Sequence, residues 1–508
     1  MTTSEIGILI AIIVYMVGVV GIGVYFTKKN STTNDFYLGG RKLGPLVTAM
    51  SAEASDMSSW LLMGLPGVAY VTGVCDAFWT ATGLAIGTYV NWLIVAKRLR
   101  TYSAVCGNSI TIPDFFANRY RDPKMLKCVS ALIIIIFFVP YTASGFAACG
   151  KLFNSLFGVN YLTAMIISAI VIVAYTTLGG FLAASTSDFV QSIIMSIALV
   201  IVLSYGIISV GGFDGVAAHV GDLKGFLSIT STHDGATNTA TPYGALTIAS
   251  TLAWGLGYFG MPHILLRFMA IEDTKKLKLS RRVASVWVVI SMAVAVSIGI
   301  IGYAMSAEGV IPNLKDSETI IVQIAHVLST HGIIFAIIAG VILAGILAST
   351  MSTSDSQLLA ASSSVSENLL EGVLGLNLSS GVKIIVARGS VIIISIIAMF
   401  LASNPNSSVF QIVSFAWAGF GATFGPVMLF ALFWKRSNKY GAISGMVAGG
   451  IMVFVWKFLV RPLGGVLGIY ELLPAFIVAS IFIVIVRLLT PAPEKEIVDE
   501  FESIKNYN

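Results

Sequence analysis

The sequence predicts an all-α integral membrane protein with thirteen transmembrane helices. The first observation behind this prediction is composition: 56% of the 508 residues are apolar and only 11% are charged, whereas soluble proteins carry about 25% charged residues. The mean hydropathy is +0.89. The second observation is a series of apolar runs of about 20 residues, the length that crosses a bilayer. The third is the uneven placement of basic residues between these runs.

The apolar runs divide most of the chain into candidate spans. The ninth run is too long for one straight crossing, and we expect it to extend as a helix into the cytoplasm. The thirteen runs are residues 6–26, 46–69, 75–96, 128–150, 160–182, 189–211, 244–266, 284–306, 320–356, 383–403, 409–433, 440–460 and 467–488.

The basic residues predict the orientation. If the N-terminus is outside, the cytoplasmic segments contain 25 Lys and Arg residues and the external segments contain five. Cytoplasmic loops of membrane proteins carry such an excess. Lys28 and Lys29, which follow the first run directly, agree with this orientation. We therefore expect an external N-terminus and, because the number of spans is odd, a cytoplasmic C-terminus.

Two carboxylates lie inside the second run, VTAMSAEASDMSSWLLMGLPG. A carboxylate in the middle of a membrane helix costs about 2.5–3.5 kcal/mol, so Glu53 and Asp56 need a partner, water or a bound ion. The small polar residues around them make the stretch from Ser51 to Ser59 a poor continuous helix. We interpret it as a helix interrupted near the midplane, where broken helices line cavities. The alternative is a short helix pair docked against its neighbours, with the acids at a water-filled mouth.

The seventh run contains a second interruption. Three glycines precede Pro262 within LAWGLGYFGMPHILLRF, and proline removes a backbone donor and disfavours helix at the residue before it. Trp254 and Tyr258 are four residues apart, so they would share one face if this end is helical. Such a pair serves either core packing or a binding pocket.

Two interrupted spans that lie five spans apart indicate an inverted-repeat transporter with a binding site near the midplane. Spans 2–6 and 7–11 would form the two repeats, and the odd period inverts the second copy. The predicted organisation is an extra span with a cytoplasmic loop (1–45), the first repeat (46–211), an external loop (212–243), the second repeat (244–433), spans 12 and 13 (434–489) and a poorly ordered cytoplasmic tail (490–508).

The ninth run carries a stripe of hydroxyl side chains. Such a stripe is either a surface for close helix packing or part of a site for a hard cation such as Na⁺, which prefers oxygen ligands. Hydroxyls here could face carbonyls freed by the break in span 2, and Asp355 at the edge of the stripe could add charge. The stripe consists of Ser349, Ser352, Thr353 and Ser356, at helical spacing.

Two other residues of the first half, Tyr141 and Asp188, lie at positions where a helix is expected to kink or begin. Tyr141 follows Pro140 in the fourth run, where the proline is expected to kink the helix. Asp188 is expected to begin the sixth span on the cytoplasmic side, where it suits an N-cap of that helix.

Several motifs together resemble the sodium:solute symporter family, and its bacterial sodium/proline symporter branch in particular. The resemblance runs nearly end to end and keeps the order of the motifs. They read LGGRKLGP (38–45), SAEASDMSSWLLMGLPG (51–67), WGLGYFGMPHILLRFMA (254–270), MSTSDSQLL (351–359) and WAGFGATFGPV (417–427).

The resemblance implies a leucine-transporter-type fold that couples one substrate to inward Na⁺ flow by alternating access. It implies a Na⁺ site with carbonyls of Ala54, Met57 and Ser349 and hydroxyls of Ser352 and Thr353, supported by Asp56. It places the substrate near Ser58, Ser59, Tyr141, Trp254, Tyr258 and Pro262. It links Arg41, Asp188, Asp355 and Ser356 to coupling or to a second Na⁺.

This chain departs from the pattern of the proline branch at four positions. Glu53 and Ser59 stand where glycine is usual, and Met261 stands where glutamine is usual. Each of these three departures can change affinity or substrate choice. At the fourth position, Asp355 replaces a small residue, which leaves undecided whether this chain has a second Na⁺ site.

The expected function is import of L-proline with Na⁺ by a multi-pass protein of the bacterial inner membrane. Another small solute (a different amino acid, pantothenate or a carboxylated sugar) is the nearest alternative, and a membrane sensor or channel is a more distant one. The sequence contains neither a Walker A motif nor HExxH, so ATP-driven pumping and zinc chemistry lack support. The five histidines form no metal or catalytic cluster by spacing, so we expect a transporter and not an enzyme. Na⁺ is the coupling ion, and we expect no organic cofactor, no nucleic-acid partner and no obligate protein partner.

Overall fold

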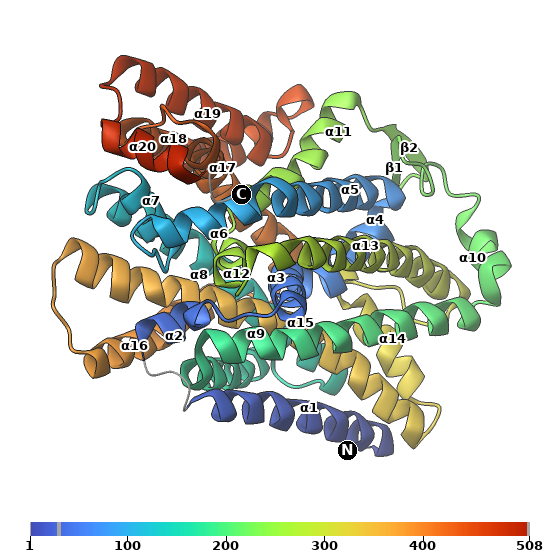
Figure 1. Ribbon diagram of the computed structural model, residues 1–508. Coiled ribbons are helices and arrows are strands. Elements are labelled where there is room, and N and C mark those ends of the chain that lie inside the picture. Colours follow the sequence, from blue (N-terminus) through green and yellow to red (C-terminus); the bar gives the residue numbers. More distant parts are fainter. Residues whose placement is uncertain (1, 28–31, 505–508) are drawn as a thin grey trace.

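Long apolar helices dominate the computed structural model, which describes residues 2–27 and 32–504 (Figure 1). Within these residues, ten helices are long and apolar enough to cross a membrane. Many large apolar side chains on their outer faces are exposed, among them Phe400 (76%) and Leu489 (81%), and lipid rather than water suits such a surface. Lys28 and Lys29, used above for orientation, lie outside the described residues.

The longer helices are α1 (Thr3–Thr27), α3 (Pro45–Ser59), α5 (Val74–Val90), α8 (Met125–Phe157), α9 (Tyr161–Ser209), α13 (Leu277–Glu308), α15 (Ile333–Ser363), α16 (Ser380–Leu401), α17 (Val409–Phe433), α18 (Lys439–Val455) and α19 (Leu472–Leu489). The shorter helices are α2 (Thr33–Leu38), α4 (Leu65–Thr72), α6 (Ala96–Val105), α7 (Ile112–Arg119), α10 (Gly212–Val220), α11 (Ala245–Leu252), α12 (Pro262–Ala270), α14 (Ile320–Ser329) and α20 (Lys495–Ser503). A π-helical turn, Asn91–Val95, joins α5 to α6.

The interruption predicted in the second run falls at Ser58. Its backbone adopts φ 46° and ψ −172° inside α3, a conformation that costs a non-glycine residue energy and is typical of functional sites. The Trp60 N–H closes the break by bonding the carbonyls of Met57 and Ser58, and the Ser58 hydroxyl also accepts from this N–H at 3.1 Å. A π-helical turn, Trp60–Gly64, then leads into α4.

The second interruption lies between α11 and α12, as predicted. A 3₁₀ segment, Ala253–Phe259, follows α11, and Pro262 occupies the first turn of α12 after an extended Met261. The 3₁₀ segment packs tightly on α17, because a Cβ on Gly257 would lie 2.0 Å from Nε1 of Trp417.

Trp254 and Tyr258 are expected to share one face only if this end is α-helical, and the 3₁₀ segment does not meet that condition. Three residues per turn place positions i and i+4 on different faces. Trp254 stacks on Tyr470 with ring centroids 5.0 Å apart, and Tyr258 meets Trp417 edge to face at 5.1 Å.

Predicted spans 5 and 6 both lie in α9, which has a break at Gly180 (φ 63°, ψ −166°). Helix resumes directly after this glycine, so Asp188 lies two turns inside the second half. Asp188 is therefore not the N-cap that the sequence favoured. Its carboxylate faces the protein interior instead and is fully buried.

The ninth predicted span is two helices rather than one. α14 ends at Ser329 and α15 begins at Ile333, separated by a turn in which Gly332 has φ 118°. α15 continues beyond the predicted end at residue 356, and a π-helical segment carries it on to Val373.

The segment 212–243 contains α10 and a short antiparallel hairpin, so the chain is not purely α. Strand β1 (Ser231–Asp234) pairs with β2 (Thr239–Pro242). The turn between them is closed by the Asp234 carboxylate, which accepts from the Ala236 N–H at 2.9 Å. In Figure 1 this hairpin and α10 lie at the right edge, opposite α2, α7 and α20 at the left.

The expectation of a poorly ordered tail is wrong for residues 495–503, which form α20. Apolar residues at helical spacing give this helix one face that packs on the protein. The Phe501 ring is buried between the guanidinium groups of Arg98, 4.9 Å away, and Arg119, 5.2 Å away. Cation–π contacts of this kind add to apolar burial.

Replacing Phe501 with alanine is expected to release α20. Loss of a buried aromatic ring costs about 3 kcal/mol, so amide hydrogen exchange of residues 495–503 should accelerate about 100-fold. The exposed Glu496→Ala on the same helix is the control and should leave the exchange rate near that of the wild type. Unchanged protection in Phe501→Ala would contradict the docking of this helix.

Candidate functional site

The break in α3 lies against the hydroxyl stripe of α15. The Ser352 hydroxyl donates to the Ala54 carbonyl at 2.8 Å and to the Ser349 carbonyl at 3.2 Å. The Thr353 hydroxyl donates to the same Ser349 carbonyl at 3.1 Å. Four of the five predicted Na⁺ ligands thus form one connected, buried group of oxygens. The fifth, the Met57 carbonyl, lies at the break itself.

Asp56 joins three separate elements at this break. Its carboxylate Oδ2 accepts the Tyr258 hydroxyl at 2.5 Å, which ties α3 to the 3₁₀ segment. Its backbone carbonyl accepts the Tyr141 hydroxyl of α8 at 3.4 Å. Asp56 is 6% exposed. A carboxylate this deep in a membrane protein is costly unless it serves an ion or a partner.

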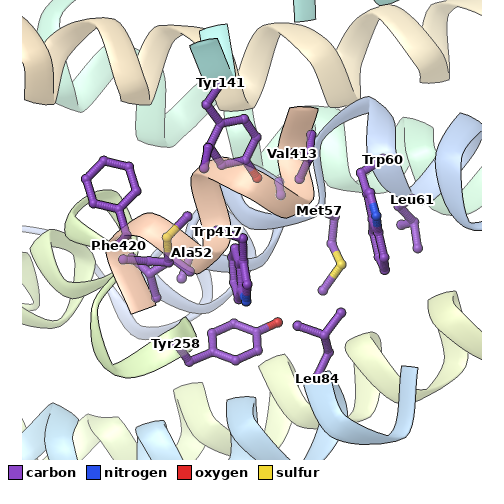
Figure 2. Packing of buried hydrophobic residues seen from close by; sticks show 14 of the residues in the cluster. Ala52, Met57, Trp60, Leu61, Leu84, Tyr141, Tyr258, Val413, Trp417 and Phe420 are labelled. Carbon is purple, nitrogen blue, oxygen red and sulfur yellow. The ribbon is translucent and has the colours of Figure 1, made fainter. Parts of the chain in front are cut away.

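A small cavity of about 10 Å³ lies directly beside Asp56. Figure 2 shows several of its walls, with the Tyr258 hydroxyl directed between Met57 and Leu84 and the Trp417 ring beside it. The lining residues are Asp56, Met57, Trp60, Leu84, Tyr141, Trp254, Val413 and Trp417.

The structure brings only some of the predicted substrate residues to this cavity. Tyr141 and Trp254 line it. Tyr258 reaches it through its hydrogen bond to Asp56. Ser59 lies just beyond the break, and its hydroxyl is buried without a hydrogen-bond partner among the described residues. Ser58 forms the break, and Pro262 starts α12; neither lines the cavity.

Aromatic rings close one side of the cavity. Trp60 stacks on Phe410 at 5.9 Å and lies 5.5 Å from Trp254, which in turn stacks on Tyr470. A wider polar cavity of about 450 Å³ lies beyond, bordered by Phe410 and Gly64.

Glu318 anchors the start of α17 next to this wider cavity. Its carboxylate accepts the backbone N–H groups of Val409 at 3.0 Å and Phe410 at 2.9 Å. It also accepts the Ser408 hydroxyl at 2.8 Å and pairs with Lys151 of α8 at 2.7 Å. An acid at a helix N-terminus is favoured by the helix dipole.

Arg267 is the centre of a second buried polar cluster. Its guanidinium pairs with Asp188 of α9 at 3.0 Å and donates to Ser356 of α15 at 2.5 Å. It donates to Ser51 of α3 at 3.0 Å, and Ser51 donates to Asp188 at 2.7 Å. Ser356 also donates to Asp355 at 3.0 Å. One guanidinium of α12 therefore connects α3, α9 and α15.

The cluster contains more acid than base. The second acid, Asp355, accepts the Tyr175 hydroxyl at 2.6 Å. Asp188 keeps one carboxylate oxygen, Oδ1, buried without a partner among the described residues. Two carboxylates with a single guanidinium leave one negative charge for a cation or a proton.

Arg41 is not part of this cluster. It lies in the turn after α2, where it donates to the carbonyls of Met269 and Ser109, both at 2.7 Å. Partial burial and the nearby Arg100 lower the pKa of Arg41 to about 10. It therefore remains charged at neutral pH and ties this loop to the end of α12.

Sequence reasoning missed several of these residues. Arg267 was counted among the basic residues of a cytoplasmic loop, yet it is 1% exposed. A signal was available, because it follows an apolar stretch inside the motif 254–270. Trp60 and Trp417 also lie inside quoted motifs. Leu84 and Val413 carry no local signal, since only the packing of distant helices brings them to the cavity.

Comparison with known proteins gives consistent matches along the chain. A model of the sodium:solute symporter family matches residues 36–449. The chain is 42% identical to the osmoregulated proline transporter OpuE of Bacillus subtilis, over 97% of this chain and 96% of that protein. It is 41% identical to the sodium/proline symporter of Haemophilus influenzae, over 97% of each. It is 42% identical to the high-affinity proline transporter PutP of B. subtilis, over 96% and 98%.

Solved structures share the fold at low sequence identity. A Na⁺-coupled sialic acid symporter, solved in a substrate-bound outward-open state, superposes with a TM-score of 0.78 at 17% identity, over 96% of this chain and 99% of that one. The transporter MhsT in complex with L-phenylalanine gives 0.55 at 14% identity, over 88% and 98%.

Removing the Arg267 guanidinium is expected to destabilise the protein strongly. Arg267→Gln leaves Asp188 buried without its countercharge, and breaking a buried ion pair on one side costs about 3–5 kcal/mol. Adding Asp188→Asn should recover much of that loss. Thermal unfolding of the purified protein in detergent measures both effects, and a double variant as unstable as the sum of the single variants would show that the pair is not coupled.

Proposed function

The chain belongs to the sodium:solute symporter family, and we propose that it is a Na⁺-coupled symporter that imports L-proline across the bacterial inner membrane. The observation that carries the proposal is the contact of the Ser352 hydroxyl of α15 with the Ala54 carbonyl at the break of α3. The substrate assignment is supported by relatives that match almost the whole chain and are named as proline transporters.

Na⁺ would bind between α3 and α15. The carbonyls of Ala54, Met57 and Ser349 and the hydroxyls of Ser352 and Thr353 are neutral oxygens, which suit a monovalent hard cation. To bind it, Ser352 turns its proton away from the Ala54 carbonyl, so that both oxygens face the ion. The ion thereby replaces a hydrogen bond that already joins the two helices.

Asp56 supports this site electrostatically. Its carboxylate belongs to the same stretch of α3 and is held by Tyr258. Through that bond, binding of the ion orders the 3₁₀ segment beside the cavity, and through the Tyr141 bond it orders α8. Ion binding is thus linked to the shape of the substrate site.

Proline would occupy the site beside Asp56 in a conformation whose cavity is wider than the volume of about 10 Å³ found here. The proline carboxylate would lie near the backbone N–H groups that follow the break at Ser58 and Ser59, because a helix start favours anions. The hydroxyl of Ser59 is a further donor without a partner among the described residues. The apolar ring would pack against Tyr141 and Trp254, and the cationic amine would meet an aromatic face.

The proposed topology keeps thirteen spans. The interrupted pairs α3–α4 and α11–α12 each count as one crossing, and Gly180 divides α9 into two. The inverted repeats would then be residues 46–211 and 244–433, with the N-terminus outside, spans 12 and 13 at 434–489 and the tail from 490 on the cytoplasmic side.

Alternating access would use the two polar contacts at opposite ends of the site. The bonds from Glu318 to the start of α17 hold the external side, and the Arg267 cluster holds the cytoplasmic side. Asp188, Asp355 and Ser356 would govern coupling or a second Na⁺ there, and Arg41 would connect the cytoplasmic loop to α12.

The coupling energy suffices for strong accumulation. One charge crossing 100 mV supplies about 2.3 kcal/mol, and a tenfold Na⁺ gradient adds about 1.4 kcal/mol. One Na⁺ per proline therefore supports a gradient of roughly several hundred-fold.

Uptake of labelled proline into proteoliposomes with an inward Na⁺ gradient tests the proposal. We expect saturable, Na⁺-dependent uptake that unlabelled proline blocks and that other amino acids, pantothenate and carboxylated sugars do not block. Ser352→Ala and Thr353→Ala should each raise the half-saturating Na⁺ concentration at least about tenfold, the cost of about 1.4 kcal/mol for one lost ligand.

The matched control is Ser363→Ala on the same helix, whose hydroxyl bonds, among the described residues, the Ala360 carbonyl of its own helix. It should keep the wild-type Na⁺ response. Uptake of a different solute would overturn the substrate assignment, and Na⁺-independent leak of many solutes would overturn coupled transport.

A further inference from the structure

A groove between α9 and α13 opens onto the outer surface of the helix bundle. It has a volume of about 510 Å³, which is in the range of pockets that hold small ligands, about 300–1,000 Å³. Its walls are apolar except for two serines and Arg282, which lies at one end. Val200 of α9 and Ile290 of α13 line the groove and are 57% and 58% exposed. The groove therefore faces the surroundings of the protein, and it shares no residue with the proposed Na⁺ and proline sites.

The inner side of the groove is held in place by packing and by one hydrogen bond. The Trp287 indole N–H of α13 donates to the Ser196 hydroxyl of α9 at 2.9 Å, which fixes the two walls relative to each other. Met50 of α3 and Ser291 of α13 are buried and form the floor. The groove is thus formed in advance of any ligand, and its floor includes the helix that carries the break at Ser58.

The α13 wall changes from basic to apolar along its length. Lys278, Arg282, Val286, Ile290 and Val294 recur every four residues, so they follow one inclined row of side chains on the helix. Lys278 and Arg282 are exposed, and neither makes a hydrogen bond or an ion pair with another described residue. The three apolar residues after them line the groove. Such a row presents charge at a membrane surface and apolar side chains below it.

The apolar part of the groove is about as long as one leaflet of a bilayer. Arg282 and Val294 are twelve residues apart, or roughly 18 Å at 1.5 Å per residue. Half of the hydrocarbon core is about 15 Å. One acyl chain with its headgroup at Arg282 fits this length. A transmembrane helix of a second copy would extend through both leaflets and leave most of its length outside the groove.

The charge at the start of α13 is basic and only partly compensated. Glu272 pairs with Lys276 at 2.6 Å, and the Asp273 carboxylate accepts the Lys275 backbone N–H at 2.8 Å. These are the two acids of segment 272–282, and they face five basic residues. Basic pockets between membrane helices suit anionic lipid headgroups. The five basic residues are Lys275, Lys276, Lys278, Arg281 and Arg282.

We propose that this groove binds an anionic phospholipid. The phosphate contacts Arg282 and Lys278, and one acyl chain lies between α9 and α13 against Met50. The lipid thereby touches α3 one residue before Ser51, whose hydroxyl donates to Asp188. The site does not depend on the proposed function, because lipid binding is measured without Na⁺, proline or transport.

Titration of the purified protein with phosphatidylglycerol, read out by native mass spectrometry, tests the headgroup contacts. Each basic residue near a membrane surface strengthens binding of an anionic lipid about fivefold. The wild type should therefore bind one phosphatidylglycerol about 25-fold more tightly than phosphatidylcholine. Arg282→Gln and Lys278→Gln should each weaken phosphatidylglycerol binding about fivefold and leave phosphatidylcholine binding unchanged.

Lys275→Gln is the matched control for charge. It removes one exposed positive charge from the same end of α13 but lies outside the row that leads into the groove, so it should keep the wild-type affinity. Equal affinities of the wild type for the two lipids would overturn the proposal. So would a loss in Lys275→Gln as large as that in Arg282→Gln.

Filling the groove tests the place of the acyl chain. Val200→Trp puts a large side chain into the groove and should weaken phosphatidylglycerol binding at least about tenfold, the effect of about two displaced methylene groups. Ile197→Trp is the matched control, because Ile197 is an exposed residue of the same helix that does not line the groove. Equal binding by the two variants would show that no chain occupies the groove.

Fluorescence quenching locates the chain in a bilayer. Phosphatidylglycerol with brominated acyl chains, present as a minor component of phosphatidylcholine vesicles, should quench Trp287 at least about fivefold more than its share of the lipid predicts. The difference between the wild type and Trp287→Phe isolates this ring. The excess should fall in Arg282→Gln and persist in Lys275→Gln. Quenching in simple proportion to the share of brominated lipid would contradict a specific site.

Other occupants give different results. Inorganic phosphate that binds as tightly as phosphatidylglycerol would make this a site for free anions and overturn a lipid site. A wild-type dimer that Val200→Trp converts to a monomer, with lipid binding unchanged, would make the groove an interface between two copies of the chain. That result would also overturn the proposal.

Discussion

A bilayer offers no hydrogen-bond partner to an open backbone, and this constraint organises the whole site. Wherever a membrane helix stops, protein groups must satisfy the freed donors and acceptors. At Ser58 the chain does so with the Trp60 N–H on one side and with the Ser352 hydroxyl on the Ala54 carbonyl on the other. The second interruption, before Pro262, brings Tyr258 to Asp56. Each break is therefore also a contact between helices, and such contacts can be exchanged for an ion or a substrate.

The same constraint explains why so many charges are buried in so apolar a protein. The Glu318 carboxylate accepts a free backbone N–H at the start of α17 and pairs with the charged Lys151. Arg267 draws four helices together through Asp188, Ser51 and Ser356. In the proposed transport mechanism, each of these two polar centres holds helices that would have to separate for substrate to pass. Burying a polar group in the bilayer costs free energy, so such groups are expected where their contacts change during transport.

Much of the fold could be predicted because a membrane forces long apolar runs and uneven basic loops. The breaks at Ser58 and before Pro262 were visible from serine, acid, glycine and proline content. Other features depend on tertiary packing. Two examples are the turn at Gly332 and the packing of Phe501 on Arg98 and Arg119. Both depend on contacts that no local sequence pattern indicates. Arg267 shows the limit most plainly, because a basic residue near a helix end is counted as a loop charge until its buried partner is known.

In the proposed mechanism, Na⁺ between α3 and α15 prepares the cavity for proline. Equilibrium binding of labelled proline and of labelled Na⁺ to the purified protein measures this coupling. We expect that saturating Na⁺ raises proline affinity, that saturating proline raises Na⁺ affinity by the same factor, and that Asp56→Asn abolishes both effects. Proline and Na⁺ that bind independently, each with an affinity unaffected by the other, would contradict it.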